Sequence, residues 1–282
     1  MRLVVLAVLS LAPAAADAYC RTEADRDQTN PTACPTGGVP LAWARRCTGV
    51  RINPTVLPSR LTATEFRAFL GSAAAAWGSF TCDGAATGPA FALAVLPDLA
   101  MDAGYSDTLP NANVVLFRPR WGDDAFHTLD AAAITVVTYT SSRGEILDAD
   151  TEMNLRSTTN PQGFLFASDG STAAADLPTI LTHELGHTQG LAHSSDRAAV
   201  MWYSAGRGEQ RRVPTADDRA GLCAVYPPAA PAACDLDPGL LVFEGSGLTC
   251  ATRPGAAHHG AACAGLALLV VGAARRRRGL GS

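Results

Sequence analysis

Residues 183–193 of this 282-residue chain read HELGHTQGLAH. His183 and His187 are four residues apart, and in an α-helix this spacing places both imidazoles on one face, one turn apart, where they can bind one zinc ion. Glu184 lies about 100° around the same helix, too displaced for a metal ligand but able to reach a zinc-bound water. The spacing therefore predicts a metal site with a general base beside it.

The neighbouring residues predict where this helix begins and ends. Asp176 can cap its start, and Pro178 is tolerated in its first turn. Gly190 can adopt the left-handed conformation that ends a helix and turns the chain back. His193 can then approach the same metal from outside the helix. Three protein ligands leave a fourth position for water, which is typical of a catalytic zinc site.

The motif and the methionine that follows it resemble the metzincin zinc endopeptidases. Residues 193–201 (HSSDRAAVM) resemble the matrixins, which place the Met-turn methionine at this distance after the third histidine, and residues 215–222 (TADDRAGL) resemble their C-terminal helix. The resemblance implies an α+β metzincin fold, with a twisted, mostly parallel sheet, an antiparallel edge strand over the cleft, about three helices and a small lower subdomain after Gly190.

The same resemblance implies roles for individual residues. It implies a catalytic zinc ion bound by His183, His187 and His193, with Glu184 as general base and Met201 as the hydrophobic floor beneath the metal. Tyr203 lies two residues after the methionine, as in astacins and serralysins, where a tyrosine can approach the zinc. The matrixin-like surroundings favour instead a tyrosine that packs in the wall of the substrate pocket.

The chain also departs from the matrixin pattern. Residues 45–49 (RRCTG) have a faint similarity to a cysteine switch, but they lie inside the first predicted strand. We therefore expect Cys47 in a disulfide, with Cys82 as one candidate partner. The spacing of the matrixin structural zinc site is not found, so we interpret His127 as an ordinary surface or core histidine.

Three acidic residues alternate along a predicted strand, where they could bind calcium. An exposed strand edge explains them equally well. These residues are Asp148, Asp150 and Glu152.

The N-terminus predicts export. Arg2, an apolar run at 3–11 and the sequence Ala16-Asp17-Ala18 are typical of a signal peptide at 1–18 that is cleaved after Ala18. The run is shorter than the roughly 20 residues of a membrane span. We therefore expect a secreted or cell-surface protein. In that oxidising environment most of the 8 cysteines are expected in disulfides, with pairings that the sequence leaves open.

The C-terminal end suggests a second targeting signal. Cys263 precedes an apolar run at 264–274, and Arg275 to Arg278 follow it. As a helix this run is about 17 Å long, short of the ~30 Å hydrocarbon core. The combination resembles the processed sorting tails of myxobacterial surface proteins. A transient membrane association or a disordered end remain as alternatives.

Patterning divides the rest of the chain. We expect an irregular arm at 19–40, a catalytic domain at 41–227, a Pro/Ala/Gly-rich linker with two cysteines at 228–262, and the anchor or sorting tail at 263–282. Within the catalytic domain, strands are predicted at 41–52, 91–96, 114–117, 134–140 and 146–153, and helices at 61–80, from Asp176 to Gly190, and from Thr215 to the prolines at 227–228.

Together these features favour a secreted or surface-attached zinc endopeptidase acting on proteins or peptides. The formal net charge is −4, and the body without its arginine tail is more acidic still, which argues against a nucleic-acid partner. The alternative is a catalytically inactive surface-binding module that zinc stabilises. Glu184 discriminates between the two, because a structural zinc site has no use for a carboxylate there.

Overall fold

The computed structural model describes residues 18–26, 28, 30–122, 127, 130–229 and 236, and the backbone of 278–281. The signal peptide except Ala18, most of the predicted linker and most of the predicted tail lie outside the described residues. The elements, in chain order, are β1 (Cys20–Arg21), β2 (Cys47–Ile52), α1 (Ala63–Gly78), β3 (Ala92–Val95), β4 (Asn113–Arg118), β5 (Ala133–Thr140), β6 (Glu145–Asn154), β7 (Phe166–Ala167), β8 (Ala175–Asp176), α2 (Leu177–Thr188), β9 (Leu191–Ala192), α3 (Ala216–Val225) and β10 (Arg278–Gly281).

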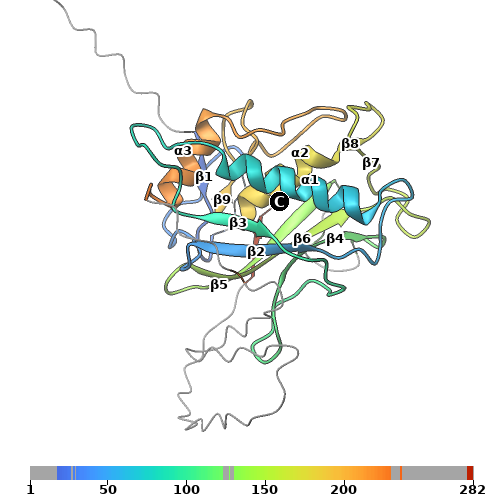
Figure 1. Ribbon diagram of the computed structural model, residues 1–282, viewed down its shortest axis with the longest axis horizontal. Helices are drawn as coiled ribbons and strands as arrows, with labels where there is room; N and C mark the ends of the chain where they lie inside the picture. Colours follow the sequence, from blue (N-terminus) through green and yellow to red (C-terminus); the bar gives the residue numbers. More distant parts are fainter. Residues whose placement is uncertain are drawn as a thin grey trace, which may run out of the picture.

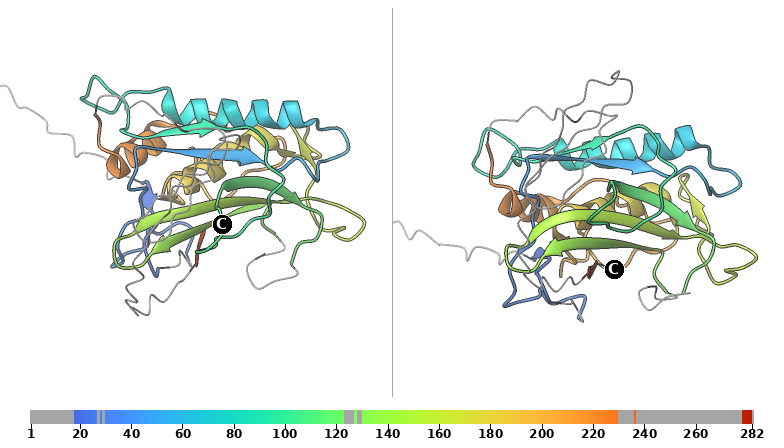
Figure 2. Two further views of the ribbon diagram at one scale, coloured as in Figure 1. Left: turned by 60° about the horizontal axis from the view of Figure 1, so that its bottom comes forward. Right: turned by 90° about the horizontal axis from the view of Figure 1, so that it is seen from below.

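A mixed six-stranded sheet runs through the molecule in the order β10-β5-β6-β4-β2-β3. β3, β2, β4 and β6 are parallel, whereas β5 is antiparallel to β6. The outer edge of β5 pairs with the backbone of β10, also antiparallel. Helices α1 and α2 pack against each other over one face of this sheet (Figures 1 and 2). The expected α+β architecture, with a mostly parallel sheet and an antiparallel strand at its edge, is confirmed.

Helix α1 forms as its local sequence predicts. Thr62 and Glu65 form a reciprocal capping box, in which the carboxylate of Glu65 accepts from the Thr62 backbone N–H at 2.9 Å. The helix buries one stripe of side chains, and the indole N–H of Trp77 donates to the Thr182 carbonyl at 2.8 Å. This bond ties α1 to α2 across the core. The buried stripe consists of Phe66, Leu70, Ala73, Ala74 and Trp77.

The strand predicted at 41–52 begins only at Cys47. The preceding residues have other backbone partners: the N–H of Leu41 donates to the Thr22 carbonyl at 2.8 Å, and the N–H of Ala42 donates to the Gly144 carbonyl at 2.9 Å. These bonds connect the N-terminal arm to the β5–β6 hairpin. Residues 41–42 therefore bridge two parts of the fold and do not extend β2.

The disulfides differ from one pairing considered above. Cys82, just after α1, is bonded to Cys223 of α3, with their Cα atoms 5.8 Å apart, so the candidate Cys47–Cys82 pair is wrong. Cys47 itself is disulfide-bonded, as expected. Cys20 is bonded to Cys34 within the N-terminal arm. The remaining cysteines of the sequence lie outside the described residues.

The acidic residues of β6 are buried, so their interpretation as an exposed strand edge is wrong. β6 lies between β5 and β4, and its carboxylates are used inside the fold. Asp150 accepts from the backbone N–H of Val114 at 2.9 Å and of Gly104 at 2.6 Å, and burial raises its pKa to about 6. Glu152 pairs with Arg118.

His127 is a core histidine, in agreement with the sequence interpretation. Its side chain is only 8% exposed, its ring meets Trp121 edge-on, and its Nε2 lies 3.5 Å from the Glu152 carboxylate.

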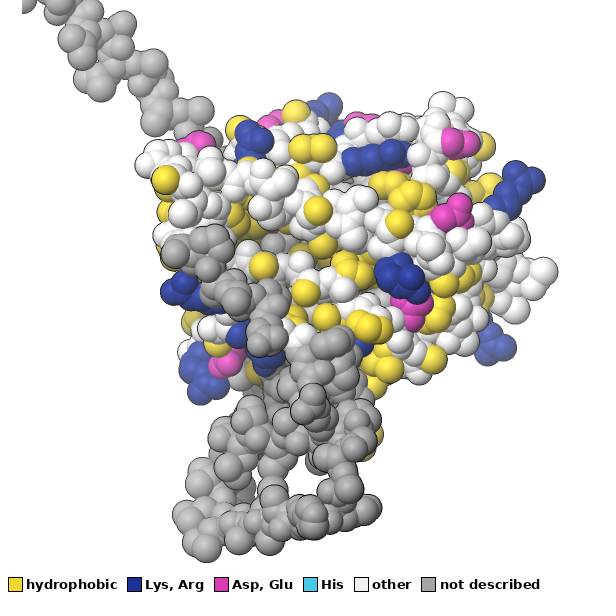
Figure 3. Space-filling view, viewed as in Figure 1, with side chains coloured by type: hydrophobic (Ala, Val, Ile, Leu, Met, Phe, Trp, Pro, Cys, Tyr) yellow, Lys and Arg dark blue, Asp and Glu magenta, His cyan; other side chains and the backbone are white. Residues whose placement is uncertain are grey.

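On the face seen in Figure 3, arginine and acidic side chains are interspersed with apolar and neutral ones, and no histidine is visible. Within the described part of the chain, every helix is too short or too polar to cross a bilayer.

Gly186 lies where α2 packs tightly against two buried side chains. A Cβ atom at this position would overlap the Met201 sulfur and lie 2.9 Å from Cζ2 of Trp77. Trp77 and Met201 are both fully buried, so neither has free space into which it could move.

We predict that Gly186→Ala lowers the free energy of unfolding by about 1–3 kcal/mol, because the added methyl group overpacks the core. Gly71→Ala is the matched control, since a Cβ at Gly71 in α1 meets nothing within 4 Å. This control should raise the stability by about 0.5–1 kcal/mol. Urea unfolding followed by circular dichroism measures both variants, and equal stabilities for them would contradict the packing argument.

Candidate metal centre and active site

Helix α2 begins and ends as predicted. Asp176 is its N-cap, with a carboxylate that accepts from the Thr179 N–H at 3.1 Å and pairs with Arg212 at 2.5 Å. After the helix, Gly190 has φ +93°, and a Cβ there would lie 2.6 Å from the Leu41 carbonyl oxygen. A left-handed turn against a neighbouring backbone requires glycine. This turn directs the chain back toward α2.

The turn brings the three motif histidines together. The Nε2 atoms of His183 and His187 are 3.1 Å apart, and the ring of His193 lies 5.4 Å from the first ring and 5.0 Å from the second, centre to centre. One nitrogen from each side chain falls within 4.8 Å of the others. Among the described residues, this is the one group of histidine, cysteine or acidic side chains with that geometry.

Backbone carbonyls fix two of the imidazoles. His183 Nδ1 lies 2.7 Å from the Val200 oxygen, and His187 Nδ1 lies 2.8 Å from the Leu191 oxygen. A carbonyl oxygen only accepts, so both Nδ1 atoms carry the proton and both Nε2 atoms present a lone pair. The two lone pairs therefore face the same point, as metal ligation requires.

The residues fit a zinc ion. His193 Nε2 is buried and has no hydrogen-bond partner among the described residues, which leaves a costly unpaired nitrogen aimed into the group. Burial lowers the pKa of His183 and of His193, and burial together with the His183 charge lowers the pKa of His187 to about 3. All three imidazoles are therefore neutral at pH 7, the state that binds metal.

Glu184 lies beside this group on α2. Its carboxylate is buried and accepts from the Thr135 hydroxyl of β5 at 2.7 Å, and that hydroxyl also lies 2.9 Å from the Thr151 hydroxyl. Burial raises the pKa of Glu184 to about 8, although the bond from Thr135 opposes the shift. A carboxylate with a pKa near neutrality can both take up and release a proton.

The segment that carries Met201 is held by α3. Asp218 is fully buried, and its carboxylate accepts from the backbone N–H of Val200 at 2.8 Å and of Met201 at 2.9 Å. The same side chain accepts from the Thr215 N–H to cap α3. Since Val200 supplies the acceptor for His183, the position of α3 determines the orientation of that imidazole.

Two further residues border the group. Met201 is 1% exposed and lies under α2 against Gly186, consistent with a hydrophobic floor. Tyr203 is 45% exposed, and its ring centre lies 6.3 Å from that of His193 and 4.6 Å from that of Trp202. The partly exposed tyrosine thus lies at the rim of the histidine group, between His193 and Trp202.

The sequence singled out His183, Glu184, His187 and His193, and the structure brings all four together. The sequence did not indicate Thr135, because no local pattern links a threonine of β5 to a glutamate 49 residues later. Asp218 lies in the predicted helix that starts at Thr215, but its contacts to residues 200 and 201 depend on the tertiary fold.

Comparison with known proteins agrees with this geometry. Residues 120–227 match the family model of the matrixins. The chain is 43% identical to Metalloendoproteinase 1-MMP of Arabidopsis thaliana over 58 residues. This aligned stretch makes up 21% of this chain and 16% of that protein. It is also 38% identical to Matrilysin of Homo sapiens over 60 residues, which make up 21% of this chain and 22% of Matrilysin. The chain thus spans less than a quarter of each relative, and its matrixin-like part is residues 120–227.

The raised pKa of Glu184 predicts an unusual pH dependence in metal-free protein. Between the ordinary value of 4.5 and about 8, the folded state keeps a proton that the unfolded state releases. This contribution to stability is complete below about pH 4.5 and is lost as the pH rises to about 8. Glu184→Gln removes this titration. Because the variant and the wild type have the same histidines, the difference in their stability reports the titration of Glu184.

We therefore expect Glu184→Gln to gain stability relative to the wild type as the pH rises from 5 to 8, by at most about 1.4 kcal/mol per pH unit. Urea unfolding of both chelator-treated proteins at pH 5, 6.5 and 8 measures the difference. A difference that stays constant with pH would mean that Glu184 titrates normally.

Proposed function

We propose that this chain is a zinc-dependent endopeptidase of the matrixin type. One observation carries the proposal: three neutral imidazoles converge on a common point, with a buried carboxylate of raised pKa beside them. His183, His187 and His193 would hold the metal and leave a fourth position open, as catalytic zinc sites do. The matrixin match over residues 120–227 supports the same assignment.

Zinc, when bound, supplies a Lewis acid that lowers the pKa of its water and polarises the substrate carbonyl. Glu184 accepts the proton of the attacking water and delivers it to the leaving amine nitrogen. Thr135 orients the carboxylate for both steps through its 2.7 Å hydrogen bond. In the metal-free protein the buried surroundings raise the pKa of Glu184, which favours its role as the proton acceptor in the first of these transfers.

Strand β5 is the proposed binding site for the substrate backbone. Its outer edge already pairs with β10 in antiparallel register, with Gly281 opposite Thr135. Thr135 contacts Glu184, so a peptide in the place of β10 would pass directly beside the proposed base. An extended peptide or protein segment that takes the place of β10 along β5 is therefore the proposed substrate. Tyr203 would contribute to the rim of the pocket.

Glu184 argues against an inactive module that zinc only stabilises. Burial of the Glu184 carboxylate costs stability, as its raised pKa indicates, and a site in which zinc only holds the fold has no need of that group. A structural site would also be expected to close its fourth position with a protein ligand. Zinc binding without any hydrolysis would favour the inactive module.

Two variants separate ligand from base. We expect Glu184→Ala to keep stoichiometric zinc, because the metal ligands remain. Its turnover should fall by about 10²–10⁴-fold or more, because the base is removed. His193→Ala should lose zinc, since two ligands bind far more weakly than three. Metal analysis and cleavage of a mixed peptide library, with and without chelator, measure both effects. Full activity of Glu184→Ala would refute the mechanism.

We also propose that the protein is exported and that residues 263–282 act as a processed sorting tail. The signal sequence at 1–18 and the arginine cluster at 275–278 support this proposal. The disulfides Cys20–Cys34 and Cys82–Cys223 agree with an oxidising environment.

We predict that the mature protein begins at Tyr19 and lacks Arg275 to Arg278. Deletion of residues 263–282 should release soluble, active protein into the medium, because the proposed ligands and base all lie at 183–193 and β10 only occupies the proposed substrate edge of β5. Intact-mass measurement and activity in the medium test this. A mature protein that retains the four arginines would contradict processing and would leave the peptidase proposal unaffected.

A further inference from the structure

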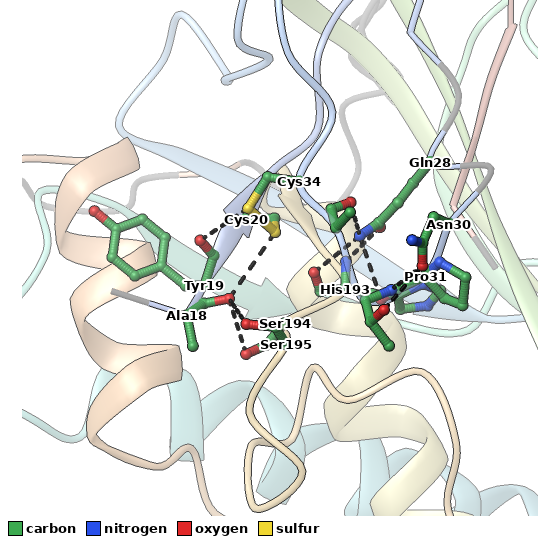
Figure 4. Close-up of a disulfide and its surroundings, with 12 residues drawn as sticks. Ala18, Tyr19, Cys20, Gln28, Asn30, Pro31, Cys34, His193, Ser194 and Ser195 are labelled. Carbon is green, nitrogen blue, oxygen red and sulfur yellow. Dashed lines mark hydrogen bonds between the residues drawn. A yellow bond between two sulfur atoms is a disulfide. The ribbon is translucent and has the colours of Figure 1, made fainter. Parts of the chain in front are cut away.

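The N-terminal arm packs along the loop that carries His193. β1 pairs with β9 in antiparallel register, with Cys20 opposite Ala192. The backbone N–H of Thr22 donates to the Gly190 carbonyl at 2.9 Å. The arm thus forms a short strand against residues 190–192, directly before the third histidine of the motif. Figure 4 shows how the two segments lie beside each other.

Gln28 of this arm binds both backbone groups of His193. Its Oε1 accepts from the His193 N–H at 2.8 Å, and its Nε2 donates to the His193 carbonyl at 3.1 Å (Figure 4). A primary amide can make this pair of bonds because it carries a donor and an acceptor on one rigid plane. The pair fixes the backbone of the ligand residue, from which its imidazole projects.

A disulfide holds the segment that carries Gln28. Cys20 is buried in β1 and is bonded to Cys34, which is exposed, so the bridge closes the loop between them. Inside that loop, Gln28 Nε2 also donates to the Ala33 carbonyl at 3.1 Å. The cross-link limits the conformations open to the loop and keeps the amide opposite His193.

The arm also reaches the acceptor of a second imidazole. The Leu191 carbonyl receives the Nδ1–H of His187 at 2.8 Å and the hydroxyl of Thr22 at 3.0 Å. Contacts from residues 22 and 28 therefore bear on two of the three motif histidines.

We propose that Gln28, held by the Cys20–Cys34 disulfide, is a positioning residue that preorganises His193 for zinc. The proposal rests on the zinc-peptidase function above, and it adds a determinant of metal affinity that lies outside the matrixin-like residues 120–227. Partners of metal ligands change metal affinity by about 10–100-fold when they are removed. The competing explanation is that the arm only stabilises the fold.

The test compares the zinc affinity of full-length wild type with that of two glutamine variants. Gln28→Leu removes both bonds to His193, and Gln162→Leu is the control at an exposed glutamine. Zinc dissociation constants are measured by competition with a chromogenic chelator. We expect Gln28→Leu to bind zinc about 10–100-fold more weakly and Gln162→Leu to match the wild type. Excess zinc should restore the kcat of Gln28→Leu. An unchanged dissociation constant for Gln28→Leu would overturn the proposal.

Two further variants separate positioning from folding. Gln28→Glu keeps the acceptor for the His193 N–H but loses the donor, and it should weaken zinc binding less than Gln28→Leu. Cys20→Ser/Cys34→Ser frees the loop and should weaken zinc binding while the Cys82–Cys223 bridge remains. Thermal unfolding of the metal-free proteins reports their folding. If Gln28→Leu does not fold and the other two variants bind zinc like the wild type, the arm is only structural.

Failure of this proposal differs from failure of the proposed function. A wild type that binds no zinc and cleaves no peptide would overturn both. A wild type that binds zinc and cleaves peptides, with all Gln28 and disulfide variants unchanged in zinc affinity, would overturn only the role of the arm.

Discussion

A buried imidazole must give its ring N–H to an acceptor, because an unpaired buried donor costs about 1–3 kcal/mol. In this protein the acceptors for His183 and His187 are the carbonyls of Val200 and Leu191. Both belong to segments that follow α2, so the helix alone cannot form the site. The left-handed turn at Gly190 is what returns these segments to the histidines.

This constraint extends to elements far from the motif. Asp218 fixes residues 200 and 201 from the start of α3, and the N-terminal arm fixes residues 190–193 from the opposite end of the chain. Trp77 of α1 and Met201 leave space for glycine only at position 186. The site therefore depends on cooperative packing of three helices and the arm around one short loop.

Features that depend on local spacing could be predicted from the sequence. The capping box of Thr62 and Glu65, the one-turn spacing of His183 and His187, and the glycine at 190 each need only a few neighbouring residues. The order of the longer strands and of the three helices was predicted correctly for the same reason, with the strand at 41–52 begun too early. The short strands β1, β7, β8, β9 and β10 were not predicted, because runs of two to four residues carry no periodic pattern.

Features that depend on distant segments could not be predicted in this way. The Gln28–His193 contact spans 165 residues, and the Cys82–Cys223 bond spans 141. The acidic residues of β6 alternate as they would on an exposed edge, and only the strand order shows that β6 lies inside the sheet. Sequence alternation indicates a strand but does not state its neighbours.

The bond between Cys82 and Cys223 also affects how the chain responds to being cut. The stretch that it encloses contains β3 to β9 and the whole histidine group, and includes the exposed connection around Leu109. A single cleavage in this stretch, by another protease or by the proposed activity of this chain, leaves both pieces covalently joined. The nicked molecule gains one water in mass and migrates as two fragments only after reduction. Loss of the intact chain on a reducing gel therefore does not show that the histidine group has been lost.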